Sequence, residues 1–330
     1  MNFNRHNKKH NFAINVDANS YEGELALPYV TAALLGAETI AKNRCRFIEG
    51  IVGNTIVSGL TATDTIQTAS CTWNDGENLA LTEQVLMPSD LAVMEEVCRG
   101  TMYPTWIAAN GRMERNGDLP TDWADFLLGV VAERTGTNLE TLLWASDTGA
   151  VFGTGFLSND GVIDEAGINA SATAGFAQHD VGTGAWTSTN ILSHMGGVFA
   201  KAQDTPGILQ KPGCGFYISY EAYALFIQAM AAQNTGAGFG QSFEGANYLG
   251  YPVYATAGIP NASGGYEGAI VFTYTDNMVV GANSYTPDIS ANLIPVYQYD
   301  GSDNVRVAIR FACGVQTAVA GDGVVGFDFA

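Results

Sequence analysis

The sequence predicts a mixed α+β protein, and three features carry that prediction. Residues 120–145 have the apolar spacing of a long amphipathic helix. Residues 58–87 are expected to form a long two-stranded ribbon around a strong turn signal. Two long strands, at 293–299 and 304–311, close the chain on either side of a second turn. Together they indicate a body of helices and sheets with one unusually long helix.

The long helix is defined by its apolar stripe and its ends. From Trp123 onward, the apolar residues recur at i, i+3, i+4, i+7 and i+8, and the stripe resumes near residue 139. Pro120 cannot sit inside a helix and marks the start, and Asp122 is a candidate N-cap. Gly129 and Gly136 each cost about 1 kcal/mol relative to alanine. We therefore expect packing on a neighbouring sheet to hold this helix.

The ribbon at 58–87 is rich in threonine and poor in large apolar residues. Asn74-Asp75-Gly76 is a turn sequence typical of hairpins. An isolated two-stranded hairpin is only marginally stable in water. The ribbon should therefore lie on the body of the protein or on the next subunit of an assembly.

The remaining segments supply further helices and strands. Residues 1–24 are expected to form an extended polar arm, and residues 146–186 a long irregular stretch. Residues 240–245 belong to a glycine-rich loop. The other expected helices are at 25–42, 190–203 and 221–233, and the other expected strands at 47–57, 215–219, 249–254, 269–274 and 276–280.

Composition favours large buried surfaces over binding to nucleic acid. The 330 residues suffice for one large domain or two ordinary ones. Only 14% are charged, where about 25% is usual. The net charge is −19, and residues 135–330 hold 16 acids against four bases, so this surface should repel nucleic acid. The basic cluster Arg5, His6, Lys8, Lys9 and His10 is expected to form a mobile arm.

The five cysteines are far apart and form no CxxC pair, which argues against a zinc site. Their odd number fits reduced thiols in a cytosolic setting. The first ten residues are polar and no apolar segment of a signal peptide follows them. No run of 18 apolar residues occurs, so no membrane span is expected.

No motif for catalysis or cofactor binding emerges. There is no P-loop and no HExxH, and Gly153-Thr154-Gly155 lacks the third glycine of a dinucleotide site. The segment 240–245 is one residue too long for a nucleophile elbow. His179-Asp180 could be half of a triad, but no nucleophile accompanies it. His194 falls in an expected helix and is interpreted as a partly buried structural side chain.

Paired acids and aromatic residues have structural explanations too. Glu95 and Glu96 would point to opposite sides of a strand, and Asp122 with Asp125 fits helix capping. Trp73, Tyr251 and Tyr254 could stack on sugars or bases, but they lack basic neighbours. We predict no catalytic, cofactor-binding or metal-binding residue. Alanine at His179, His194, Glu95 or Asp125 should abolish no turnover, and assembly is the expected function.

The order of these parts resembles the major capsid proteins of tailed double-stranded DNA bacteriophages, whose fold is shared with encapsulins. Leu249-Gly250-Tyr251-Pro252-Val253 resembles a run that is common before a strand in these proteins. Ile259-Pro260 and the strands at 269–272 and 276–280 continue in the expected order. The resemblance covers nearly the whole chain as an arrangement of elements.

The resemblance implies a domain plan. Residues 1–46 would form the N-terminal arm and its helix, and residues 47–100 the extended loop. Residues 101–205 would form the peripheral domain with its spine helix. Residues 206–292 would form the axial domain, and residues 293–330 the closing strands that return to the peripheral domain.

The resemblance also implies the function of a structural shell protein. Hexamers and pentamers would self-assemble in the host cytoplasm into an icosahedral virion capsid, enclosing DNA without sequence-specific binding. A portal protein and decoration proteins would be partners. The arm is short for a built-in scaffold, so a separate scaffolding protein is expected. Residues 51–81 contain no lysine, so a lysine–asparagine crosslink from the extended loop is not expected.

Two alternatives remain. An encapsulin-type nanocompartment shell protein would share the fold. A secreted, acidic, β-rich binding or hydrolytic protein is disfavoured by the missing signal peptide and the unpaired cysteines.

Overall fold

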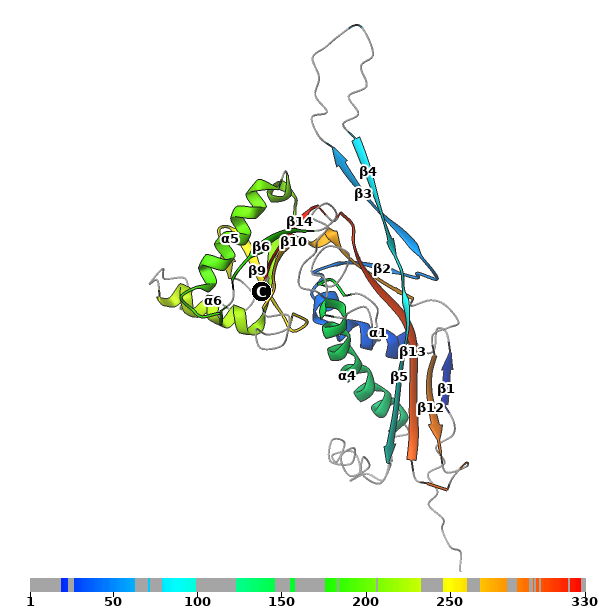
Figure 1. The fold of residues 1–330 in the computed structure, drawn as a ribbon. Helices are drawn as coiled ribbons and strands as arrows, with labels where there is room; N and C mark the ends of the chain where they lie inside the picture. The colour runs from blue at the N-terminus through cyan, green and yellow to red at the C-terminus, as the bar shows by residue number, and fades with distance from the viewer. Residues whose placement is uncertain are drawn as a thin grey trace, which may run out of the picture.

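The computed structural model shows two lobes and a hairpin that projects beyond them (Figure 1). It combines helices with three sheets, so the predicted α+β class is confirmed. It describes residues 19–22, 27–62, 71, 79–98, 123–145, 155–157, 176–182, 184–205, 207–232, 246–259, 268–283, 290–296, 299, 301–302, 304–319 and 321–327.

Six strands build the sheet of the first lobe, here called the spine lobe: β1 (Asn19–Glu22), β2 (Arg46–Glu49), β5 (Ser89–Cys98), β11 (Met278–Asn283), β12 (Ser290–Pro295) and β13 (Asn304–Thr317). The long strand β13 is the centre. One edge pairs antiparallel with β12 and then β11, and the other edge pairs with β5 over ten residues. β1 adds to β12, and β2 runs parallel to β11. The expected closing pair of strands is confirmed as β12 and β13.

Helices α1 (Leu27–Leu35), α2 (Glu38–Ala41) and α4 (Trp123–Ala145) complete the spine lobe. The helix expected at 25–42 is wrong as a single element, because the chain turns at Gly36 between α1 and α2. Gly36 lies against Gly136 of α4, and a Cβ on Gly136 would be only 2.7 Å from the Gly36 carbonyl carbon. Glycine on both sides therefore lets the two backbones touch.

The predicted spine helix is confirmed as the 23-residue α4, about 35 Å long at 1.5 Å per residue. Its start at Pro120 and Asp122 lies outside the described residues. Leu127 and Val131 are buried, as the stripe predicts, and Leu128, which the stripe did not include, is buried as well. The buried face does not lapse in the polar middle of the helix, where Thr135 is buried as well. Polar residues thus continue the face that the apolar pattern left open.

The second lobe is a sheet in the order β6-β14-β10-β7-β9-β8 with two helices packed on it. An aromatic core including Phe216, Phe226 and Phe272 joins sheet and helices. Its elements are β6 (Ala177–Asp180), α5 (Ile191–Asp204), η3 (Ile208–Gln210), β7 (Cys214–Ser219), α6 (Tyr220–Ala232), β8 (Asn247–Tyr248), β9 (Tyr251–Thr256), β10 (Ile270–Tyr274) and β14 (Gly323–Phe327), with η4 (Thr275–Asn277) leading from β10 back to β11.

Most boundaries in the second lobe match the sequence prediction, including the helices α5 and α6. The strand expected from residue 249 starts at Tyr251 instead, because Leu249 and Gly250 form a turn between β8 and β9. Both turn residues have positive φ, at +50° and +90°. That conformation suits glycine and is unusual for leucine.

The projecting hairpin consists of β3 (Thr55–Ala62) and β4 (Leu79–Leu86), in Figure 1 the blue and cyan strands at the top. The expected strand at 47–57 is wrong as one element, because the chain turns at Gly50, where φ is +75°. Its two ends become β2 and β3. The ribbon itself is confirmed, and its turn at residues 74–76 lies outside the described residues.

The two lobes divide the chain differently from the domain ranges expected from the sequence. β6 and α5, from the range expected to be peripheral, pack in the second lobe. β11 and β12, from the range expected to be axial, pair in the spine lobe. A single buried cluster runs through both lobes and includes Trp144, Val271 and Ile309. The lobes therefore share a core at their junction.

Candidate intersubunit surfaces

The hairpin is anchored only at its root among the described residues. Val57 and Leu86 are buried in a small cluster with Val279, Ala318 and neighbouring apolar residues of the spine lobe. The Gln316 side-chain amide donates to the Val85 carbonyl at 3.1 Å and ties β4 to the end of β13. A hairpin held at one end presents the rest of its surface to its surroundings.

The opposite face of the hairpin is apolar and exposed. Ile56 pairs directly with Val85, and Leu81 lies on the same face as Val85 because side chains repeat with a period of two. Their exposed fractions are 61% for Ile56, 41% for Val85 and 61% for Leu81. Ser58 and Glu83 lie between these side chains on the same face, and exposed large apolar side chains grouped in this way mark a candidate interaction surface.

Strand β5 continues from the hairpin along the spine lobe and offers a second surface. Leu91 is buried, whereas Met94 is largely exposed. Among the described strands β5 pairs only with β13, so it is an edge strand of this sheet. An edge strand of ten residues is a ready template for pairing with another chain. The polar end carries Glu96, which accepts from Asn304 at 2.7 Å and from Arg306 at 2.8 Å.

The histidines considered as catalytic candidates lie in the second lobe. His179 is in β6 and packs directly on Gly197 of α5, which leaves no room there for a side chain. His194 is in α5 and stacks on Trp186 at 5.8 Å. Burial lowers the pKa of His194, and the charge of His179 lowers it further. Asp180 accepts from the Gly182 amide at 2.8 Å, so this carboxylate closes a turn.

The other nominated residues lie on other elements or outside the described part of the chain. Glu95 and Glu96 are both exposed in β5 of the spine lobe, whereas β6 and α5, which carry the histidines, belong to the second lobe (Figure 1). Tyr251 and Tyr254 are half-buried in β9. Trp73, Asp122, the range 240–245 and the side chain of Asp125 fall outside the described part of the chain. The structure thus does not bring the nominated residues that it describes together into one site.

Across the described residues, no three His, Cys, Asp or Glu side chains gather closely enough to hold a metal ion. Of the five cysteines, Cys71 and Cys98 are exposed, and Cys45, Cys214 and Cys313 are buried. Burial raises the pKa of Cys45 and Cys313 to about 12 and that of Cys214 to about 11. None of the described helices is both long enough and apolar enough to cross a membrane.

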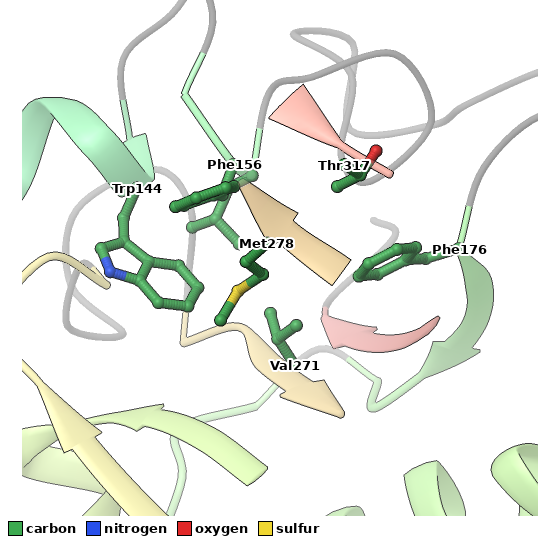
Figure 2. A pocket seen from close by; sticks show the side chains of 7 residues that line it. Trp144, Phe156, Phe176, Val271, Met278 and Thr317 are labelled. Carbon is green, nitrogen blue, oxygen red and sulfur yellow. The ribbon is translucent and has the colours of Figure 1, made fainter. Parts of the chain in front are cut away.

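Sequence reasoning missed a buried acid at the junction of the lobes. Glu140 of α4 is 2% exposed and accepts hydrogen bonds from Thr39 and Thr256. One helix turn further on and on the same face, Trp144 faces a small apolar gap that Val271 and Met278 also line (Figure 2). The apolar residues Leu143 and Trp144, three and four positions after it, share its face of the helix and are the signal that could have marked this acid as buried.

Comparison with known proteins identifies solved structures with a similar arrangement of elements. No protein-family profile matches the chain, and no curated protein sequence does. The capsid of a native GTA particle is 14% identical, with 91% of each chain covered and a TM-score of 0.57. The SrpI encapsulin complex of Synechococcus elongatus is 12% identical, with 89% of each chain covered and a TM-score of 0.54. The capsid of the Myoviridae phage XM1 is 10% identical over 88% of this chain and 91% of that one, with a TM-score of 0.52.

This is the tailed-phage capsid fold. The resemblance inferred from the order of elements in the sequence is confirmed at the level of the fold. The projecting hairpin, the spine helix α4 and the long strand β13 are parts of a fold found in capsids and in an encapsulin.

Proposed function

We propose that this chain is the subunit of an icosahedral virus shell that assembles from hexamers and pentamers and encloses double-stranded DNA. The observation that carries the proposal is the hairpin, with its exposed apolar face and its single anchor at the root. Such a surface is costly for a free monomer and becomes stabilising when a second copy covers it. The shared fold with particle-forming proteins points to the same role.

The proposal assigns each lobe a place in the shell. The spine lobe takes the peripheral role and lies along the edges of each hexamer or pentamer. The second lobe takes the axial role around the symmetry axes, and the hairpin with β5 reaches a neighbouring copy. Main-chain pairing along an exposed strand edge supplies affinity in such contacts, and several contacts per subunit add through multivalency.

We also propose partners and a location for this protein. The protein would be a component of the virion capsid, assembled in the host cytoplasm with a separate scaffolding protein and a portal protein, and with decoration proteins where the particle carries them. The acidic body would enclose DNA without binding its sequence, since like charge opposes tight contact with phosphate. The proposed role requires no enzymatic step.

The exposed hairpin face provides the test. The double variant Ile56→Thr with Val85→Thr keeps strand-forming residues but removes most of the apolar face. Because both side chains are exposed, the melting temperature of the unassembled subunit should not change. Closed shells, counted by electron microscopy, should fall at least tenfold. Deleting residues 61–79 should likewise leave a folded body that forms no closed shells.

Ser58→Thr is the matched control, because Ser58 lies on the same strand and face but contributes no apolar surface. It should assemble like the parent chain. Normal shells from the double variant would show that the hairpin face makes no essential contact, and a parent chain that never assembles would refute the shell function.

The encapsulin match supports a second candidate, a protein nanocompartment. Particles isolated from the native source distinguish the two. Packaged double-stranded DNA supports the virus shell, whereas a defined protein cargo without DNA supports the nanocompartment.

A further inference from the structure

The junction between the lobes contains a buried hydrogen-bond network, here called the Glu140 joint. It is made of Glu140, Thr39, Thr256 and Trp144. The Glu140 carboxylate accepts from the Thr39 amide at 2.9 Å, the Thr39 hydroxyl at 2.6 Å and the Thr256 hydroxyl at 2.6 Å. The Trp144 indole N–H donates to the Thr39 hydroxyl at 2.8 Å. All four side chains are buried. The Glu140 joint therefore connects α2, α4 and β9, which are far apart in sequence.

Glu140 replaces a helix cap that the sequence of α2 does not supply. The N-cap residue of α2 is Ala37, which has no side chain that can accept a hydrogen bond. The first amides of a helix lack partners within the helix. The Glu140 carboxylate accepts one of them, from Thr39, across 101 positions of sequence. Helix α2 therefore depends on the spine helix for its first turn.

Thr256 connects the second lobe to the Glu140 joint. It is the last residue of β9, and its hydroxyl also accepts from the Gly258 amide at 3.2 Å. A Cβ on Gly258 would lie 2.5 Å from the Glu140 carbonyl oxygen, so the chain after β9 touches the backbone of α4. Nearby, the Arg44 guanidinium donates to the Ala255 carbonyl at 2.5 Å. The end of β9 is thus held from two sides by the spine lobe.

The joint has an apolar half behind the indole ring. Trp144 packs edge-on against Phe156 at 5.4 Å and tilted against Tyr217 of β7 at 5.6 Å. Figure 2 shows Trp144, Val271 and Met278 around a gap that is too tight to admit a water molecule. The indole ring is therefore packed among apolar side chains, while its N–H is bonded to the Thr39 hydroxyl.

We propose that the Glu140 joint fixes the second lobe at one angle to the spine helix, and so sets the subunit geometry that determines the size of the shell. This inference rests on the proposed shell function. A carboxylate suits the position because all three partners donate to it, two of them to Oε1 and one to Oε2. Glutamine would turn an N–H toward one of these donors.

The test compares Glu140→Gln and Thr256→Val with the parent chain. Amide hydrogen exchange of the unassembled subunit should rise at least tenfold at Thr39 and Gly258 and stay unchanged in β7 and β13. Assembled particles, measured by electron microscopy, should change from one diameter to a broadened or shifted distribution. Thr256→Val removes a single hydroxyl, so it tests the joint even if Glu140→Gln does not fold.

Glu133→Gln and Thr137→Val are matched controls, because both residues are exposed on the same helix. Both should behave like the parent in exchange and in particle diameter. Unchanged exchange at Thr39 and Gly258 in Thr256→Val would refute the joint. Raised exchange with the parental diameter would refute its link to shell size.

The failure of the shell function itself has a different signature. A parent chain that forms no shells under any condition overturns the proposed function, and the link to shell size falls with it. The exchange measurement on the subunit still decides whether the joint couples the lobes.

Discussion

Two glycines on one helix provide a sharp test of how the spine helix is held. At Gly129 an added Cβ meets nothing within 4 Å, whereas at Gly136 it meets the Gly36 backbone at 2.7 Å and the Ala33 carbonyl oxygen at 2.8 Å. Alanine stabilises a helix by about 1 kcal/mol relative to glycine. Gly129→Ala should therefore stabilise the subunit by about 1 kcal/mol.

Gly136→Ala gains the same stabilisation of about 1 kcal/mol from helix propensity. Its Cβ, however, must push the backbone of α4 away from the backbone at Gly36 and Ala33. The atoms it meets belong to the backbone and cannot rotate away. Overpacking of this kind costs about 1–3 kcal/mol, and contacts this short favour the upper end. We expect a net loss of about 2 kcal/mol, so the two variants should differ by about 3 kcal/mol.

Thermal unfolding of the unassembled subunit, followed by circular dichroism at one scan rate, measures the difference. At about 2 °C per kcal/mol for a chain of this size, Gly129→Ala should raise the midpoint by about 2 °C and Gly136→Ala should lower it by about 4 °C. Equal increases in both variants would show that α4 does not touch the backbone of Gly36 and Ala33 at Gly136. The packing argument would then be wrong.

Three further predictions follow from charge, burial and composition. The lowered pKa of His194 means that the unfolded chain, with a histidine pKa of about 6.5, binds protons more readily than the folded chain. The folding stability present above that pH should fall as the pH drops below it, and His194→Gln should weaken the dependence of the melting midpoint on pH; an unchanged dependence in this variant would contradict the reasoning. Iodoacetamide at pH 8 should label the exposed thiols Cys71 and Cys98 and leave the three buried thiols unmodified, since their pKa values are raised; mass spectrometry showing a third label on the folded subunit would contradict this. Boiling particles in detergent with reductant should release one band at 34.8 kDa, because residues 51–81 contain no lysine, and a ladder would reveal a covalent link formed elsewhere.

Much of the fold could be predicted because its signals are local. The periodicity of α4, α5 and α6, the apolar strands β7 and β10, and the closing pair β12 and β13 are each encoded within one continuous stretch of sequence. Turn sequences mark the hairpin in the same way. The order of these parts, together with the run at 249–253, was enough to identify the resemblance to the capsid fold.

Which face of the hairpin is buried, and where distant segments meet, could be learned only from the tertiary structure. Alternation along β3 and β4 allows either face to be buried, and only the anchoring of Val57 and Leu86 beneath β11 and β13 decides that Ile56 and Val85 face outward. The split at Gly36 has the same origin, since one helix crossing another at a glycine pair is a contact between distant segments.

Glu140 shows the limit most clearly. From sequence alone, a glutamate in a helix is expected to be exposed, because a buried carboxylate without partners is strongly disfavoured. Its partners are Thr39, 101 positions before it, and Thr256, 116 positions after it. Only folding brings these donors to one point. The sequence by itself therefore determined the elements and their order, and the tertiary structure decided which polar side chain could be buried between them.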